Sequence, residues 1–268
     1  MTINNKIRFG YHGFLNSRPL IAPLLTGRID HNLELICDTP ARLADMLKEG
    51  EIDMGIIPSI EYARGNGSYL LIPNISISSE GDVDTVLLVG MKRFEDIDVV
   101  AVDSGSRTSV VLLRIIFRDR LGREPEMISM EPDLEKMMDR ADAALIIGDN
   151  AFKVDRSRFN IYDLSTEWYD LTARPFVHAV LAVRHGVGLR NEPELLWKAK
   201  EIGSSMIDEI AVEGGERLGI TPDICRDYLR NKIIYDLGKK ELDSLRFFYS
   251  ISKGYSLIEE DVEIRFLT

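Results

Sequence analysis

Residues 103–109, which read Asp-Ser-Gly-Ser-Arg-Thr-Ser, combine hydroxyl side chains, a glycine and an arginine between two apolar segments. The run 97–102 has the composition of a buried strand, and 110–120 has the apolar periodicity of a helix. The pattern predicts a strand-to-helix loop with its hydroxyls at the helix N-terminus. Because first-turn N–H groups lack intrahelical partners and the helix dipole is positive there, such an end binds anions. Arg107 adds a cation that can bind a carboxylate through two hydrogen bonds.

Three other loops have a similar chemical character: Asn-Ser-Arg-Pro at 16–19, Pro-Ser at 58–59 and Gly-Asp-Asn at 148–150. Loops that follow strands of an open α/β sheet gather at one edge of the sheet, where ligands bind. Several neutral donors with few full charges suit a polyoxygenated dicarboxylate. Any one of these loops could instead supply only helix N-caps. Arg18 and Arg107 could equally pair with the acidic surface.

We expect Asn16 to be catalytic. The candidate substrate-binding residues are Ser17, Arg18, Ser59, Ser79, Ser106, Arg107, Thr108, Ser109, Gly148, Asp149 and Trp168. Ser79 belongs to the segment 76–84, which is rich in Ser, Gly and Asp. Trp168 lies near Arg174-Pro175 and could form a pocket wall, although aromatic residues at such spacing are more often part of a core.

No sequence motif indicates a metal or a nucleotide cofactor. The histidines at 12, 31, 178 and 185 are scattered and lack metal-binding spacing. The glycine motifs of dinucleotide and nucleotide loops are absent, as is the G-x-S-x-G elbow of hydrolases. Cys37 and Cys225 form no C-x-x-C pair. We therefore expect no cofactor and no metal.

Composition narrows the class of protein further. The 268 residues carry a net charge of −11, with 45% hydrophobic and 29% charged residues. This is an ordinary globular composition, and its acidity argues against nucleic acid or an anionic membrane as a partner. No apolar run approaches the length of a membrane span, and the N-terminus has no signal-peptide pattern. These observations predict a cytoplasmic protein, either a monomer or a homodimer.

Strand and helix patterns alternate twice along the chain. Residues 6–75 alternate between strands and helices, a Ser/Gly/Asp loop follows at 76–84, and the alternation restarts from 85 to 184. Helical patterns then cover 192–212, 222–237 and 239–253. The alternation predicts mainly parallel sheets with helices on both faces. Chain crossings near 86–90 and 179–184 divide the chain into lobe I (1–86 plus 185–268) and lobe II (87–184).

Several segments together resemble one known family. They are Phe-Leu-Asn-Ser-Arg-Pro-Leu at 14–20, Asp-Met-Gly-Ile-Ile-Pro-Ser at 53–59 followed by Glu61-Tyr62, the 103–109 loop running into Leu-Leu-Arg at 112–114, and the stretches 144–149, 163–168 and 175–177. They are similar, in the same order, to the chorismate dehydratases of the futalosine route to menaquinone. The resemblance covers most of the chain. The segments 11–13, 82–85 and 173–175 depart from the family pattern.

The resemblance implies a two-lobed, periplasmic-binding-protein-like (type II) α/β fold with two mixed sheets and a central cleft. It also implies a carbon–oxygen lyase that converts chorismate to 3-[(1-carboxyvinyl)oxy]benzoate and water without a cofactor. The ring C3 proton is acidified through the conjugated ring carboxylate, and stabilising the resulting dienolate lowers the barrier. We expect Ser106, Thr108 and Ser109 to hold one carboxylate, and Asn16 and Ser17 to face the reacting edge. No side chain stands out as general base, so the enolpyruvyl carboxylate of the substrate could serve.

Three alternatives remain. A solute-binding protein of a transporter, or a cytosolic ligand sensor, would share the fold and the carboxylate-binding loops. The sister enzyme of the route, a dihydroxynaphthoate synthase, is the third alternative, but its family has a histidine in an Ile-His-Glu segment near the middle of the chain. The corresponding residues here are Ile147-Gly148-Asp149, which favours the dehydratase.

Overall fold

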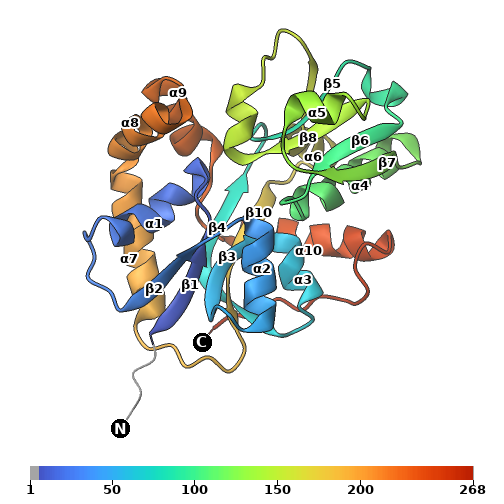
Figure 1. The fold of residues 1–268 in the computed structure, drawn as a ribbon. Coiled ribbons are helices and arrows are strands. Elements are labelled where there is room, and N and C mark those ends of the chain that lie inside the picture. The colour runs from blue at the N-terminus through green and yellow to red at the C-terminus, as the bar shows by residue number, and fades with distance from the viewer. Residues whose placement is uncertain (1–5, 268) are drawn as a thin grey trace.

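The computed structural model describes residues 6–267 and folds them into two α/β lobes (Figure 1). The strands are β1 (Ile7–Tyr11), β2 (Leu33–Cys37), β3 (Met54–Pro58), β4 (Tyr69–Ser79), β5 (Val86–Gly90), β6 (Val99–Asp103), β7 (Glu126–Met130), β8 (Ala143–Ile147), β9 (Asn160–Asp163) and β10 (Phe176–Arg184). The α-helices are α1 (Arg18–Leu25), α2 (Pro40–Glu49), α3 (Ser59–Arg64), α4 (Thr108–Leu121), α5 (Leu134–Met138), α6 (Leu164–Thr172), α7 (Glu192–Ser205), α8 (Ile207–Leu218), α9 (Pro222–Asp227) and α10 (Lys239–Gly254). Shorter turns are η1 (Leu15–Ser17), η2 (Phe94–Asp96), η3 (Gly148–Lys153) and the π-helical η4 (Tyr228–Lys232).

Each lobe is built on one five-stranded mixed sheet. The first sheet has the order β2-β1-β3-β10-β4 and the second the order β7-β6-β8-β5-β9. Within them β1, β2 and β3 run parallel, as do β6, β7 and β8, whereas β10 and β5 are antiparallel to both of their neighbours. The two mixed sheets implied by the family resemblance are confirmed. The alternation pattern overstated the parallel character, because it does not show where a strand returning from the other lobe inserts.

The strand order also corrects the lobe boundary. Strand β10 lies between β3 and β4 in the first sheet. The chain therefore returns to lobe I before Phe176, not at 179–184, and residues 176–184 belong to lobe I. The first crossing lies between the end of β4 at Ser79 and the start of β5 at Val86. The return was predicted too far along the chain, because β10 is mostly apolar and its sequence does not show which sheet it joins.

Two helical segments are shorter than the sequence pattern predicted. The run 192–212 is divided at Met206 into α7 and α8, after the weak helix formers Gly203, Ser204 and Ser205. The run 222–237 ends at Lys232, and the next residues pair with the end of β4. Strand β4 accordingly extends through Ser79, within the segment predicted to be a loop.

Close packing of α7 against α1 fixes the start of α1, which follows the Asn16 loop. At Gly203 of α7, an added Cβ would lie 1.7 Å from the carbonyl oxygen of Pro19, so only glycine permits this approach. The loop is thereby anchored to lobe I through backbone contact. Within residues 6–267, none of the helices combines the length and the apolar character that crossing a bilayer demands.

Candidate functional site

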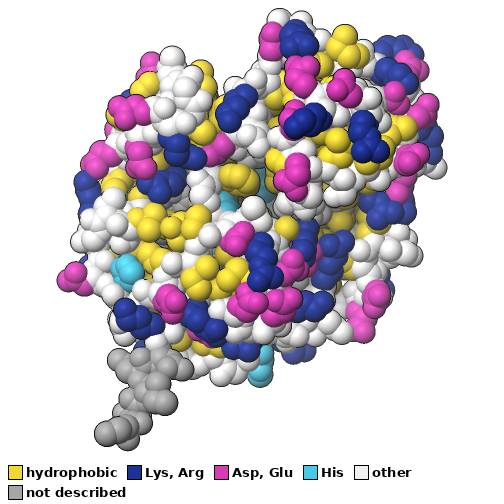
Figure 2. All heavy atoms as spheres, in the orientation of Figure 1, with side chains coloured by type: hydrophobic (Ala, Val, Ile, Leu, Met, Phe, Trp, Pro, Cys, Tyr) yellow, Lys and Arg dark blue, Asp and Glu magenta, His cyan; other side chains and the backbone are white. Residues whose placement is uncertain are grey.

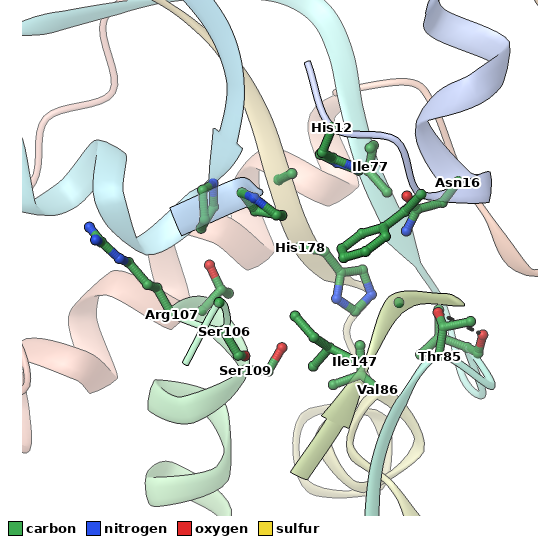
Figure 3. A pocket seen from close by; sticks show the side chains of 18 residues that line it. His12, Asn16, Ile77, Thr85, Val86, Ser106, Arg107, Ser109, Ile147 and His178 are labelled. Atoms are coloured by element: carbon green, nitrogen blue, oxygen red, sulfur yellow. Dashed lines mark hydrogen bonds between the residues drawn. The ribbon is translucent and has the colours of Figure 1, made fainter. Parts of the chain in front are cut away.

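A cavity of ≈ 70 Å³ lies between the two lobes. Figure 2 shows the surface hollowed between them, and Figure 3 shows the side chains that line the cavity. The lining residues are His12, Phe14, Asn16, Pro40, Pro58, Ile77, Val83, Thr85, Val86, Gly105, Ser106, Arg107, Thr108, Ser109, Ile147, Gly148, His178 and Ala179. Both lobes therefore contribute, and the cavity lies where the sequence placed the cleft.

The 103–109 loop has the predicted structure, between β6 and the N-terminus of α4. The Asp103 carboxylate accepts a 2.8 Å hydrogen bond from the Gly105 N–H, and the Asp103 carbonyl accepts one from the Ser106 N–H. These bonds turn the chain so that residues 106–109 line the cavity. The Ser106 hydroxyl is buried there without a hydrogen-bond partner among the described residues. A buried hydroxyl in this state can bind a ligand oxygen.

Arg107 joins the two lobes. Its guanidinium bonds both Asp45 oxygens, at 2.8 and 2.7 Å, and lies 3.1 Å from a Glu61 oxygen. Asp45 is on α2 and Glu61 on α3, both in lobe I. The pKa of Arg107 is raised because these carboxylates outweigh the opposing effect of burial. Arg107 lines the cavity, but in Figure 3 its guanidinium points away from the other labelled side chains. Its charge is thus already balanced within the protein.

Thr108 also joins the lobes, because its hydroxyl accepts a 3.2 Å hydrogen bond from the Ile60 N–H of α3. Asp149, in η3 of lobe II, makes a further contact with lobe I. Its carboxylate accepts hydrogen bonds from the Leu15 N–H at 2.8 Å and from Arg217 at 2.9 Å. Burial is the main cause that raises the pKa of Asp149. Asp149 does not line the cavity; it holds the turn that carries Asn16.

Asn16 lies in the turn η1, and its side chain lines the cavity. Its Oδ1 atom is buried with no hydrogen-bond partner in the described part of the chain. Asn16 therefore offers a buried, unpaired acceptor to a ligand.

Six of the candidate residues lie outside the cavity lining: Asp149, described above, Ser79, described below, and Ser17, Arg18, Ser59 and Trp168. The Ser17 hydroxyl donates to the carbonyls of His12 and Phe14, so it shapes the turn. Arg18 pairs with Glu213 at 2.6 Å. The Ser59 hydroxyl donates to the Val177 carbonyl at 2.7 Å.

Trp168 is fully buried and donates from its indole N–H to the Pro175 carbonyl. It packs edge-on against Phe176 and Phe248, at ring-centroid distances of 5.5 and 5.9 Å. Trp168 is therefore part of the hydrophobic core, which was the alternative to a pocket wall in the sequence analysis. Gly148 does line the cavity, with a φ of +61°, and it packs against Phe14.

Sequence reasoning did not assign His12, Thr85 or His178 to the site, yet all three line it. The available signal for His178 was a single imidazole within the apolar run 176–183. His178 Nε2 lies 2.8 Å from the Ser79 hydroxyl, so the candidate Ser79 touches the site through His178. Desolvation by burial lowers the pKa of both His12 and His178 to about 4. Both imidazoles are therefore neutral at neutral pH.

The side chains of this site are suited to binding an anion through uncharged hydrogen-bonding groups. Its polar lining consists of hydroxyls, an amide, two neutral imidazoles and the helix α4 N-terminus, and its one arginine is already paired. Within residues 6–267, no three or more His, Cys, Asp or Glu side chains form a group that could hold a metal ion.

The family model described as menaquinone biosynthesis matches residues 7–253. A chorismate dehydratase from Thermus thermophilus is 30% identical over 214 residues, covering 72% of this chain and 77% of that protein. Two solved structures share the fold at lower identity. A protein from Archaeoglobus fulgidus has a TM-score of 0.78 at 17% identity, covering 96% of this chain and 100% of that one.

The second structure is the periplasmic aliphatic sulphonate binding protein of Escherichia coli. It has a TM-score of 0.66 at 14% identity, and the match covers 97% of this chain and 96% of that one. This likeness confirms the predicted periplasmic-binding-protein-like fold. The match along residues 7–253 and the curated relative agree with each other, and the chain belongs to the menaquinone biosynthesis family.

Proposed function

We propose that this protein is a chorismate dehydratase, a hydro-lyase of the futalosine route that releases water from chorismate and forms 3-[(1-carboxyvinyl)oxy]benzoate. The structural observation that supports the proposal is a set of buried polar atoms directed at one cavity. Asn16 Oδ1, Ser106 Oγ and His12 Nδ1 are all buried without hydrogen-bond partners among residues 6–267, and all three residues line the cavity. Because buried polar atoms are normally paired, a polar ligand is the natural partner for these three.

The chemistry of chorismate fits these groups. Chorismate has two carboxylates, which accept hydrogen bonds, and one ring hydroxyl, which can donate one. The Ser106 hydroxyl and the first-turn N–H groups of α4 are donors and suit a carboxylate. Asn16 Oδ1 is an acceptor and suits the ring hydroxyl. Ser106 and Asn16 belong to different lobes, so one substrate molecule would be held at both ends.

The reaction needs a proton acceptor for ring C3. Neither imidazole in the cavity is a strong base, because burial lowers the pKa of each to about 4. The enolpyruvyl carboxylate of the substrate is held beside C3 by its own ether bond. It takes the C3 proton, and the C–H electron pair is delocalised into the ring carboxylate, which gives a dienolate. The C3–C4 double bond then forms as the C4–O bond breaks. The departing hydroxide takes that proton and leaves as water, so atoms and charge balance.

In this mechanism the protein orients and stabilises the substrate. Asn16 holds the C4 hydroxyl in position for departure. Residues 106–109 hold a carboxylate at the positive end of α4, where negative charge is stabilised. Aromatisation of the ring supplies the driving force. No residue of the chain changes its covalent state.

Incubation of the purified protein with chorismate tests the proposal. The product has lost one water, so a mass loss of 18 Da and an aromatic ultraviolet absorption are expected, with product proportional to enzyme concentration. A parallel sample without protein controls for spontaneous decomposition of chorismate. Intact chorismate after prolonged incubation with folded protein would overturn the proposal, and saturable binding without turnover would favour a solute-binding role.

A further inference from the structure

His178 is the ring in Figure 3 that lies between Ser106 and Ser109 on one side and Thr85 and Asn16 on the other. It projects from β10 in lobe I and lines the cavity. Its Nε2 atom lies 2.8 Å from Ser79 Oγ, at the end of β4. Ser79 Oγ in turn lies 2.6 Å from Ser165 Oγ, in the first turn of α6 in lobe II. A line of hydrogen bonds therefore runs from the cavity into the second lobe.

The number of hydroxyl protons gives this line a direction. Ser79 and Ser165 each have one hydroxyl proton to donate. If Ser165 donates to Ser79, and Ser79 donates to His178 Nε2, both protons have an acceptor. In the opposite direction the Ser165 proton has no acceptor, since in the described chain its hydroxyl bonds only Ser79. The first direction makes Nε2 an acceptor and places the imidazole proton on Nδ1.

The remaining ring nitrogen is then a hydrogen-bond donor. His178 Nδ1 has no hydrogen-bond partner within residues 6–267, and this atom is not fully buried. It is thus accessible from the cavity that His178 lines. Desolvation by burial keeps the ring neutral. A neutral imidazole N–H stabilises a developing oxyanion without needing a counter-ion.

We propose that His178 is a catalytic residue whose Nδ1–H donates a hydrogen bond to the ring carboxylate of the substrate. Removal of the C3 proton delocalises negative charge onto that carboxylate, so the bond strengthens as the reaction proceeds. His178 keeps its proton throughout. Ser79 and Ser165 are positioning residues that hold the required tautomer. This inference rests on the proposed dehydratase function and adds the group that stabilises the dienolate.

Two substitutions separate the role of the donor from that of the ring. His178→Asn keeps an N–H donor close to the position of Nδ1, whereas His178→Leu removes it. We expect kcat to fall about 100-fold or more in His178→Leu, with KM changed by less than about 5-fold, as for loss of an oxyanion donor. His178→Asn should retain kcat within about 10-fold. His185→Leu, at an exposed histidine outside this cavity, is the matched control and should match the wild type.

A spectroscopic test determines the tautomer of His178 in the wild-type protein. The ¹⁵N shifts of the His178 ring in wild-type protein at pH 7 distinguish the tautomers, and His178→Asn assigns the signal. The Nδ1–H tautomer is expected, and the Nε2–H tautomer would overturn the inference. Ser79→Ala should populate both tautomers and lower kcat.

The two proposals fail in different ways. Intact chorismate with wild-type protein would overturn the dehydratase function. Equal turnover by wild type and a folded His178→Leu would overturn the His178 role alone.

Discussion

The backbone N–H of Ile60 donates a 3.2 Å hydrogen bond to the Thr108 hydroxyl, and this contact joins α3 of one lobe to α4 of the other. Both residues are buried, with exposed fractions of 0% and 4%. A residue predicted from sequence to bind substrate therefore also holds the lobes together. The hydroxyl accepts from Ile60 and keeps its own proton for a ligand.

Thr108→Val removes the acceptor and leaves the buried Ile60 N–H unpaired. We expect the free energy of unfolding to fall by about 1–3 kcal/mol, and KM for chorismate to rise. Urea unfolding and steady-state kinetics measure the two effects. Thr108→Ser keeps the hydroxyl and should restore both. A Thr108→Val protein with wild-type stability and KM would show that the contact is unimportant.

Arg107→Gln removes the ion pairs with Asp45 and Glu61 that join the lobes beside the cavity. We expect a more open arrangement, seen as a larger radius of gyration in X-ray scattering. KM should rise about 10-fold, equivalent to about 1.4 kcal/mol. Arg28→Gln removes the Arg28–Glu209 ion pair within lobe I and serves as the control. Loss of kcat with unchanged KM would instead indicate direct contact with the reacting group.

Asn16→Ala removes the buried acceptor directed at the cavity. We expect kcat to fall about 100-fold or more with only a modest loss of binding, because the amide acts on the departing hydroxyl. Asn160→Ala, at an exposed asparagine of lobe II, controls for loss of an amide elsewhere. Unchanged kcat in Asn16→Ala would contradict a catalytic role for Asn16.

Gly148→Ala tests the packing of the cavity wall. Gly148 has a φ of +61°, and an added Cβ would lie 2.9 Å from the Phe14 ring. The left-handed backbone alone costs about 1–2 kcal/mol. Gly122→Ala is the matched control, because Gly122 has a φ of +65° with nothing within 4 Å of an added Cβ. Both variants should lose stability in urea unfolding, but only Gly148→Ala should raise KM, through displacement of Phe14.

The two buried imidazoles make stability depend on pH. Their pKa is about 4 in the folded state, below the ordinary value of 6.5. The unfolded state therefore binds protons more readily than the folded state. The stability that the neutral imidazoles contribute is fully present above pH 6.5, and the free energy of unfolding decreases as the pH falls towards 4. At pH 5 each imidazole costs about 2 kcal/mol of unfolding free energy.

Urea unfolding at pH 7 and pH 5 checks this expectation against His178→Asn, which lacks one of the two groups. The variant should lose about 2 kcal/mol less than the wild type between these pH values. Equal losses in both proteins would show that the His178 pKa is not lowered on folding.

The sequence by itself determined the elements and the loops that carry the chemistry. Residues 103–109 predicted an anion-binding helix start, and Asn16, Ser106, Thr108 and Ser109 do line one cavity. Such local patterns are readable because hydrophobic periodicity and turn residues act over a few positions. The family resemblance added the two-lobed fold, which the comparisons confirm.

Only the tertiary structure decided which of these side chains face the cavity. Ser17 and Ser59 bond to backbone carbonyls, and Arg18 pairs with Glu213, 195 positions along the chain. His178 enters the site because β10 returns from lobe II and inserts between β3 and β4. Hydrogen-bond partners and strand insertions are set by packing between residues far apart in the chain, and local sequence patterns do not show this packing.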